Sequence, residues 1–183
     1  MIGVRALRIP DVKIFEGRVF SDDRGYFLEG WNARALSATG FHENFVQDNV
    51  VQSRHGVVRG LHYQMRRPQG KLVRCVAGEV FDVAVDLRRT SISFGHWVGE
   101  YLTAENGLGI WIPPGFAHGY CVLSEAATVY YKCTEFYEPA EERGLVWTDP
   151  DIGIEWPLSR VRKPVINVRD ASAPRLSVAE TYP

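Results

Sequence analysis

The chain has 183 residues, enough for one domain that buries a core without disulfides. Its 21 Lys and Arg against 22 Asp and Glu leave a net charge of −1, which argues against general nucleic-acid binding. Residues 1–10 lack the apolar stretch of a signal peptide and no apolar run could span a membrane, so we expect a cytoplasmic protein without membrane association. The odd number of cysteines, each among apolar neighbours, indicates reduced core thiols at Cys75, Cys121 and Cys133.

Strand-length apolar runs dominate the chain. Residues 31–40 are the main exception, because they predict a helix that ends at Gly40. Residues 71–87 contain two strand-length runs joined by residues 77–79, a short connection suited to a hairpin. Further strands are expected at residues 96–103, 109–114, 119–124 and 128–137, and a short turn at 177–182.

The spacing of these strands indicates the fold class. Gly, Pro, Asn and Ser separate them at short intervals, which favours a β-sandwich or barrel over βαβ units. The second run of residues 71–87 alternates, with Phe81, Val83, Val85 and Leu87 on one face and Asp82, Ala84 and Asp86 on the other. Because the sequence has no repeat or linker, residues 1–183 are expected to form one domain.

A basic segment lies in the first half of the chain. Residues 49–78 contain no Asp or Glu, while the six basic residues there are Arg54, Arg59, Arg66, Arg67, Lys71 and Arg74. This local imbalance suggests an anionic ligand bound at one place. For Arg66 and Arg67 taken alone, a solvated loop is an equally good interpretation.

Arg59 and His62 are two polar residues of this segment that lie among the apolar residues Val57, Val58 and Leu61. Both side chains are costly to bury without partners, so they are either satisfied structurally or functional. A single histidine in such a setting is more often structural. For Arg59 the structural alternative is a buried pair with Asp82 or Asp86.

The spacing around His62 resembles a cupin metal motif. Cupins often combine a Gly, five residues and His-x-His with a later Pro-x-Gly-x-x-His segment; here Gly56 and His62 match the start, and residues 113–118 match the second segment and end at His118. The second His position is Gln64, and no Glu follows where the motif needs one. Two imidazoles and an amide suit zinc or iron poorly, so we expect no metal site and histidines available for proton transfer.

Longer motifs carry a more specific resemblance. They are residues 45–64, 69–88, 93–106, 111–125, 130–139 and 142–157. Together they resemble the dTDP-4-dehydrorhamnose 3,5-epimerase family, and the match extends from residues 17–29 to residues 168–174. The resemblance implies an all-β, cupin-type jelly roll with a few short peripheral helices and no metal or organic cofactor. It also implies a homodimer that exchanges residues 1–30 between protomers and binds a dTDP-4-keto-6-deoxy sugar.

The chemistry of this family explains the residue types. A ketone at C4 of the sugar acidifies the hydrogens on C3 and C5, so inversion needs a base on one face and a proton donor on the other. By resemblance, His62 is the base, Asp170 orients it, and Tyr131 is the acid. Tyr130 is the register alternative, and strand alternation sends the two tyrosines to opposite faces.

The resemblance also implies a set of substrate contacts. They are Arg24, Glu29, Gln47, Asp48, Asn49, Arg59, Lys71, His118, Tyr137, Glu142 and Arg169. Arg24 and Glu29 would reach across from the other protomer. Tyr137 would stack on thymine, with core packing as the alternative, and Glu141 is the register alternative to Glu142. Arg169 stands where many members carry lysine, which does not offer the same geometry.

Three other functions compete with a double epimerase. A monofunctional 3- or 5-epimerase would use the same base and fold, although Tyr131 favours two inversions. A metal-dependent cupin oxygenase and a non-catalytic sugar-nucleotide-binding protein are the rivals from other classes.

Overall fold

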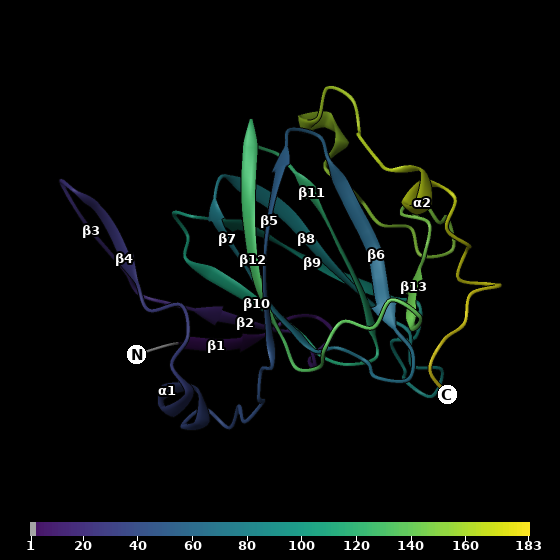
Figure 1. Cartoon of the computed structure of the whole chain (residues 1–183), viewed down its shortest axis with the longest axis horizontal. Helices are drawn as coiled ribbons and strands as arrows, with labels where there is room; N and C mark the ends of the chain where they lie inside the picture. Colours follow the sequence, from purple (N-terminus) through teal and green to yellow (C-terminus); the bar gives the residue numbers. More distant parts are fainter. Residues whose placement is uncertain (1–2) are drawn as a thin grey trace.

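Two antiparallel sheets form the body of the computed structural model, which describes residues 3–183 (Figure 1). The six-stranded sheet has the order β1 (Gly3–Ala6), β2 (Lys13–Glu16), β10 (Leu108–Ile112), β7 (Lys71–Ala77), β12 (Ala126–Cys133) and β5 (Gln47–Arg54). The five-stranded sheet has the order β13 (Glu142–Gly144), β6 (Val58–Gln64), β11 (Phe116–Val122), β8 (Glu79–Asp86) and β9 (Trp97–Thr103). This pair of sheets confirms the predicted all-β jelly roll.

Helices are short and peripheral. The expected helix in residues 31–40 is α1 (Ala33–Ser37), and Gly40 has the positive φ of a helix terminator, +82°. The other helical turns are α2 (Val168–Ala171) and the 3₁₀ turn η1 (Leu158–Arg160). Within residues 3–183, no helix has the length and apolar character needed to cross a membrane.

Residues 71–87 do not form the predicted hairpin. β7 pairs with β10 and β12, whereas β8 pairs with β11 and β9 in the other sheet. The chain crosses between the sheets at Gly78, which has φ +78° and leaves no room for a Cβ beside the Ala126 carbonyl. β8 is buried on both faces, which suits an interior strand of a sheet that is covered on both sides.

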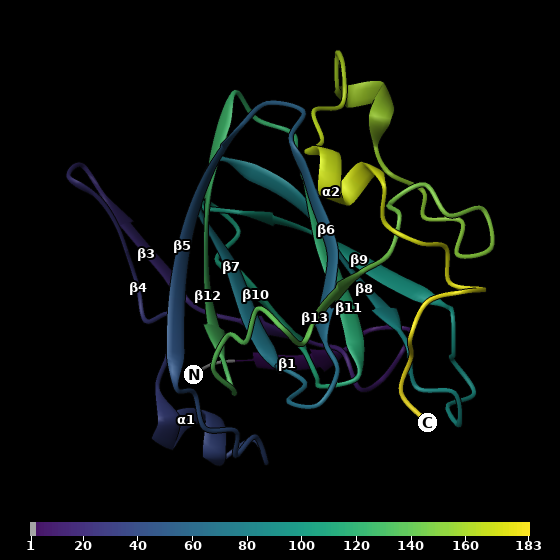
Figure 2. The ribbon, with the colours of Figure 1, turned by 45° about the vertical axis from the view of Figure 1, so that its right-hand side comes forward.

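The two faces of β8 enter different cores. Val80 and Ala84 pack between the two sheets with Val73, Ile110 and others. Phe81, Val83, Val85 and Leu87 face the other way, as predicted, and are covered by the chain that follows β13. Figure 2 shows this C-terminal segment, coloured from light green to yellow, running past β6 and β13. The five-stranded sheet is therefore buried on both faces, and inward-pointing polar residues lie between the sheets.

A two-stranded ribbon extends away from this body (Figure 1). It consists of β3 (Val19–Asp22) and β4 (Gly25–Leu28), which pair with each other. Phe20, Tyr26 and Phe27 on the ribbon are all exposed, Phe27 by 67%. By contrast β1 and β2 pair within the chain's own six-stranded sheet. Of the N-terminal region expected to be exchanged, residues 19–28 are the part that projects.

Candidate active site

His62 on β6 is held by Asp170 on α2. His62 Nε2 lies 2.8 Å from Asp170 Oδ1, and Asp170 Oδ2 accepts the Gly60 N–H at 3.1 Å. Asn167 caps α2 by accepting the Asp170 N–H, which fixes the position of the carboxylate. Burial alone would raise the pKa of Asp170, but the hydrogen bond and charge of His62 and the Gly60 N–H lower it below its ordinary value. Asp170 is therefore an ionised partner that orients the imidazole.

A second histidine–carboxylate pair lies beside the first. His118 on β11 is directly opposite His62 in the register of the two strands. Its Nε2 lies 2.9 Å from Asp82 Oδ2, and both residues of this pair are buried. From the sequence, Asp82 was a candidate only for pairing with Arg59. Its place on the polar face of an alternating strand was the available signal for a position inside the site.

Arg59 does not form the buried ion pair that was its structural alternative. Its Nε donates to Ser53 Oγ at 2.9 Å and the residue stays exposed, while Asp82 is bonded to His118 and Asp86 to Arg88. Arg59 lies on the same face of β6 as His62, because Val58, Leu61 and Tyr63 pack into the core on the other face. An exposed guanidinium on the same face as His62 can bind an anionic or oxygen-rich ligand.

Tyr131 and Tyr130 point to opposite faces of β12. Tyr131 packs against the core between the sheets, where burial raises the pKa of its phenol to about 12. The Tyr130 hydroxyl instead donates to Asp48 Oδ2 at 2.9 Å, and Lys132 binds the same carboxylate. Tyr131 is thus the tyrosine on the inner face, and it is protonated, hence able to donate a proton, near neutral pH.

The inner face of the six-stranded sheet supplies further polar groups. Burial lowers the pKa of Lys71, while Cys133, Glu142 and Asp82 favour its charged form. On β5, Gln47 Nε2 donates to Asn49 Oδ1 at 3.0 Å, and Asn49 Nδ2 lies 3.5 Å from Cys133 Sγ. These contacts place Lys71, Gln47 and Asn49 on one wall, facing the sheet that carries the two histidines.

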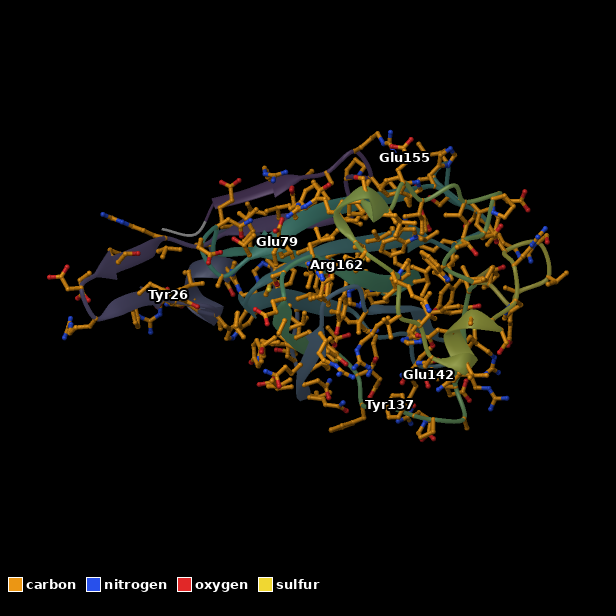
Figure 3. All side chains as sticks on the ribbon, turned by 90° about the horizontal axis from the view of Figure 1, so that it is seen from above. Tyr26, Glu79, Tyr137, Glu142, Glu155 and Arg162 are labelled. Carbon is orange, nitrogen blue, oxygen red and sulfur yellow. The ribbon has the colours of Figure 1, made fainter. Side chains whose placement is uncertain are left out.

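Tyr137, Glu142 and Arg169 form a connected group. Figure 3 shows Tyr137 and Glu142 close to each other. The Tyr137 hydroxyl donates to Glu142 Oε2 at 2.7 Å, and Arg169 lies 2.6 Å from the same oxygen. Burial opposes ionisation of Glu142, but these two partners lower its pKa below the ordinary value. Glu141 contacts Arg66 instead, so Glu142 is the glutamate of this group. Tyr137 is 47% exposed, so the core-packing alternative is wrong.

Three of the expected contact residues lie elsewhere in this chain. Arg24 is near the tip of the ribbon, 2.5 Å from Asp22, and Figure 3 shows the ribbon residue Tyr26 on the left of the view, well separated from Tyr137. Glu29 accepts a hydrogen bond from Asn32 at 2.9 Å. Asp48 is on the outer face of β5, bound to Lys132 and Tyr130. Within one chain, these three residues are not brought to the histidines.

A cavity of about 310 Å³ lies beside the pair formed by His62 and Asp170. Its lining includes His62 and Asp170, together with Glu142 and Arg169. In residues 3–183 no three His, Cys, Asp or Glu side chains are grouped as ligands of one metal ion. The amide at the motif position, Gln64, is engaged by backbone groups: Oε1 accepts the Glu138 N–H and Nε2 donates to two carbonyls. From the sequence, Gln64 was only the residue that replaces a histidine of the cupin motif.

Known proteins resemble this chain over nearly its whole length. Residues 6–178 match the family model described as dTDP-4-dehydrorhamnose 3,5-epimerase. A protein of that name from Pseudomonas aeruginosa is 54% identical, covering 97% of both chains, and one from Shigella flexneri is 51% identical, covering 95% of this chain and 96% of its own. The crystal structure of a dTDP-6-deoxy-D-glucose-3,5-epimerase from Legionella pneumophila, in complex with dTDP-4-keto-L-rhamnose, has a TM-score of 0.94 at 44% identity, covering 98% of this chain and 95% of the other.

These matches agree with the site as the geometry describes it. They extend from β2 to the C-terminal segment, and so include the strands that carry both histidines as well as α2, which carries Asp170. The histidine–carboxylate pair, the inward tyrosine and the jelly roll are the features that the resemblance predicted. By its sequence and its structure, the chain belongs to the dTDP-4-dehydrorhamnose 3,5-epimerase family.

Proposed function

We propose that the protein inverts C3 and C5 of dTDP-4-dehydro-6-deoxy-D-glucose to give dTDP-4-dehydro-L-rhamnose. The observation that carries this assignment is the placement of base and acid on facing sheets. His62, bonded to an ionised Asp170, belongs to the five-stranded sheet, whereas the protonated Tyr131 belongs to the six-stranded one. A sugar ring between the sheets would have the base on one face and the proton donor on the other, as inversion requires.

The reaction then consists of proton transfers. His62 removes the hydrogen next to the 4-ketone, the electron pair moves into the enolate, and Tyr131 returns a proton to the same carbon from the opposite face. Lys71 and His118 are placed to stabilise the enolate oxygen. His62 then releases its proton and Tyr131 regains one by exchange with solvent, so that the same steps at the other carbon complete the double inversion. No electron leaves the sugar, so the chemistry requires no redox carrier.

Binding of the nucleotide part is assigned to the surrounding polar groups. In this proposal Arg59 and Arg169 face the pyrophosphate, Gln47 and Asn49 contact the nucleoside, and Tyr137 stacks on thymine. Arg24 and Glu29 reach the same ligand from the ribbon of a second copy, so the active form is a homodimer. A cytoplasmic location is part of the proposal, because the three buried cysteines are unpaired thiols.

Product analysis tests this function. The purified protein is incubated with dTDP-4-dehydro-6-deoxy-D-glucose, and ¹H NMR coupling constants of the sugar identify which centres have been inverted. We expect the doubly inverted sugar as the main product. Accumulation of a sugar inverted at only one carbon would assign the protein to the monofunctional epimerases, and an unchanged substrate would refute the proposal.

A further inference from the structure

Gln64 is a buried amide whose polar atoms all bind the backbone of other segments. It is 3% exposed and lies on β6, two residues after His62. Its Oε1 accepts the Glu138 N–H at 2.8 Å, and its Nε2 donates to the carbonyls of Phe136 at 3.2 Å and Arg67 at 2.8 Å. A primary amide can offer two donors and one or two acceptors, so this side chain is fully used.

These hydrogen bonds hold the chain on both sides of Tyr137. The Phe136 carbonyl precedes Tyr137 and the Glu138 N–H follows it, so one amide fixes both flanking peptide groups. The Tyr137 N–H itself donates to Gln47 Oε1 at 2.9 Å, and its hydroxyl donates to Glu142. Tyr137 is nevertheless 47% exposed, so few apolar contacts hold its ring and hydrogen bonds must do so.

The same amide links this ring to the catalytic strand. His62 and Gln64 lie on one face of β6, and β13 pairs with that strand so that Gly144 is opposite His62 and Glu142 is opposite Gln64. The separation between Tyr137 and the base is therefore set by one strand and a few short hydrogen bonds. Apolar replacement of Gln64 would leave two carbonyls and an N–H without this partner.

We infer that Gln64 is a positioning residue, which orders Tyr137 for nucleotide binding without touching the substrate itself. The inference rests on the proposed function, because it takes the nucleotide as the ligand of Tyr137. It predicts a defect in binding rather than in chemistry, since His62, Asp170 and Tyr131 keep their own contacts when Gln64 is replaced.

The test compares Gln64→Met with the wild type. We expect the dissociation constant for dTDP, measured by calorimetry, and KM for the sugar nucleotide to rise by about tenfold, the effect of roughly 1.4 kcal/mol. We expect kcat to stay within about threefold. Gln64→Glu, which keeps the acceptor for the Glu138 N–H and loses both donors, is the second variant if the Met variant does not fold, and the same pattern is expected.

Gln69→Met is the matched control. Gln69 also donates its amide across the same two segments, but to the Glu135 carbonyl at 2.9 Å, outside the peptides that flank Tyr137. We expect its dTDP affinity to stay within about twofold of the wild type. If both Met variants weaken dTDP binding equally, loss of either link between these segments has the same effect. That result would overturn the assignment to Gln64.

A double-mutant cycle separates positioning from general loss of structure. In a Tyr137→Ala background there is no ring left to order, so Gln64→Met should change dTDP affinity by less than about twofold. A full additional loss in that background would contradict the inference, as would a fall in kcat at unchanged KM. Wild-type protein that neither binds dTDP nor epimerises would refute the proposed function, whereas an active wild type with an unimpaired Gln64→Met variant would refute the positioning role alone.

Discussion

His62 and Asp170 are separated by 108 positions in the sequence, yet a 2.8 Å contact joins them. Their pairing depends on local details: the Gly60 N–H and the Asn167 cap both act on the same aspartate. An aspartate stabilised in its ionised form adds to folding stability as well as to the orientation of the base. Ionisation of Asp170 should therefore appear as a pH dependence of the free energy of unfolding.

The folded-state pKa of Asp170 lies below its ordinary value of 3.8, because the partners of the carboxylate outweigh its burial. The stability that it contributes is fully present above the unfolded pKa and is lost as pH falls through the folded one. We predict that the wild type unfolds at higher denaturant concentration than Asp170→Asn near pH 6, and that the gap narrows as pH falls toward about 3. Urea titrations at several pH values measure the unfolding midpoints of the two proteins. A difference between the midpoints that widens on acidification would contradict the prediction.

Tyr131 allows proton removal to be separated from proton return. In Tyr131→Phe, His62 can still take a proton and exchange it with solvent, but delivery from the other sheet is lost. We expect measurable deuterium exchange at one carbon or both, while formation of the doubly inverted product falls by about two to four decades. NMR in D₂O measures both quantities on one sample.

Tyr130→Phe is the control for that prediction, because its hydroxyl binds Asp48 on the outer face. Turnover should stay near the wild-type value. Loss of product in the Tyr130 variant, with normal turnover in the Tyr131 variant, would reverse the assignment of the acid.

Among the secondary-structure elements, the projecting ribbon of β3 and β4 can contribute to substrate binding only if two copies of the chain form a dimer. Its aromatic residues are exposed, and it carries Arg24 away from the chain's own histidines. We predict that Phe20→Ser combined with Phe27→Ser weakens dimer formation and dTDP binding together. Ile92→Ser, which alters a fully exposed apolar residue outside the ribbon, is the control and should change neither. Analytical ultracentrifugation measures dimer formation, and calorimetry measures the affinity for dTDP. A wild-type protein that is monomeric, or a monomeric variant with wild-type affinity for dTDP, would contradict the prediction.

Strands were predictable because their alternation is a local property. The two faces of β8 and the opposite directions of Tyr130 and Tyr131 follow from a period of two. The connection at Gly78 was not predictable in this way, since a tight turn can join neighbours in one sheet or carry the chain to the other. α2 was missed as a helix because four residues contain no helical periodicity. Its Asp170 was identified only through the family resemblance.

At the scale of the whole molecule, the C-terminal segment both completes the core and completes the site. It covers the outer face of the five-stranded sheet and supplies Asp170 to the inner strand β6. Contacts near the chain end hold it there: Tyr63 donates to the Glu180 carbonyl, Arg143 pairs with Glu180, and Tyr182 donates to the Gln64 carbonyl. Asp170 therefore contacts His62 only when this segment is folded against the sheet. No local sequence pattern could have revealed this contact between distant residues.

In the proposed mechanism one base, His62, serves both carbons, so the wild type and a His62→Ala variant should differ in deuterium incorporation at both. Each protein is incubated in D₂O with dTDP-4-dehydro-6-deoxy-D-glucose, and NMR follows the label at C3 and at C5. We expect incorporation at both positions by the wild type and at neither by the folded His62→Ala variant. Wild-type incorporation at either carbon in the variant would contradict it, because a second base would then be at work.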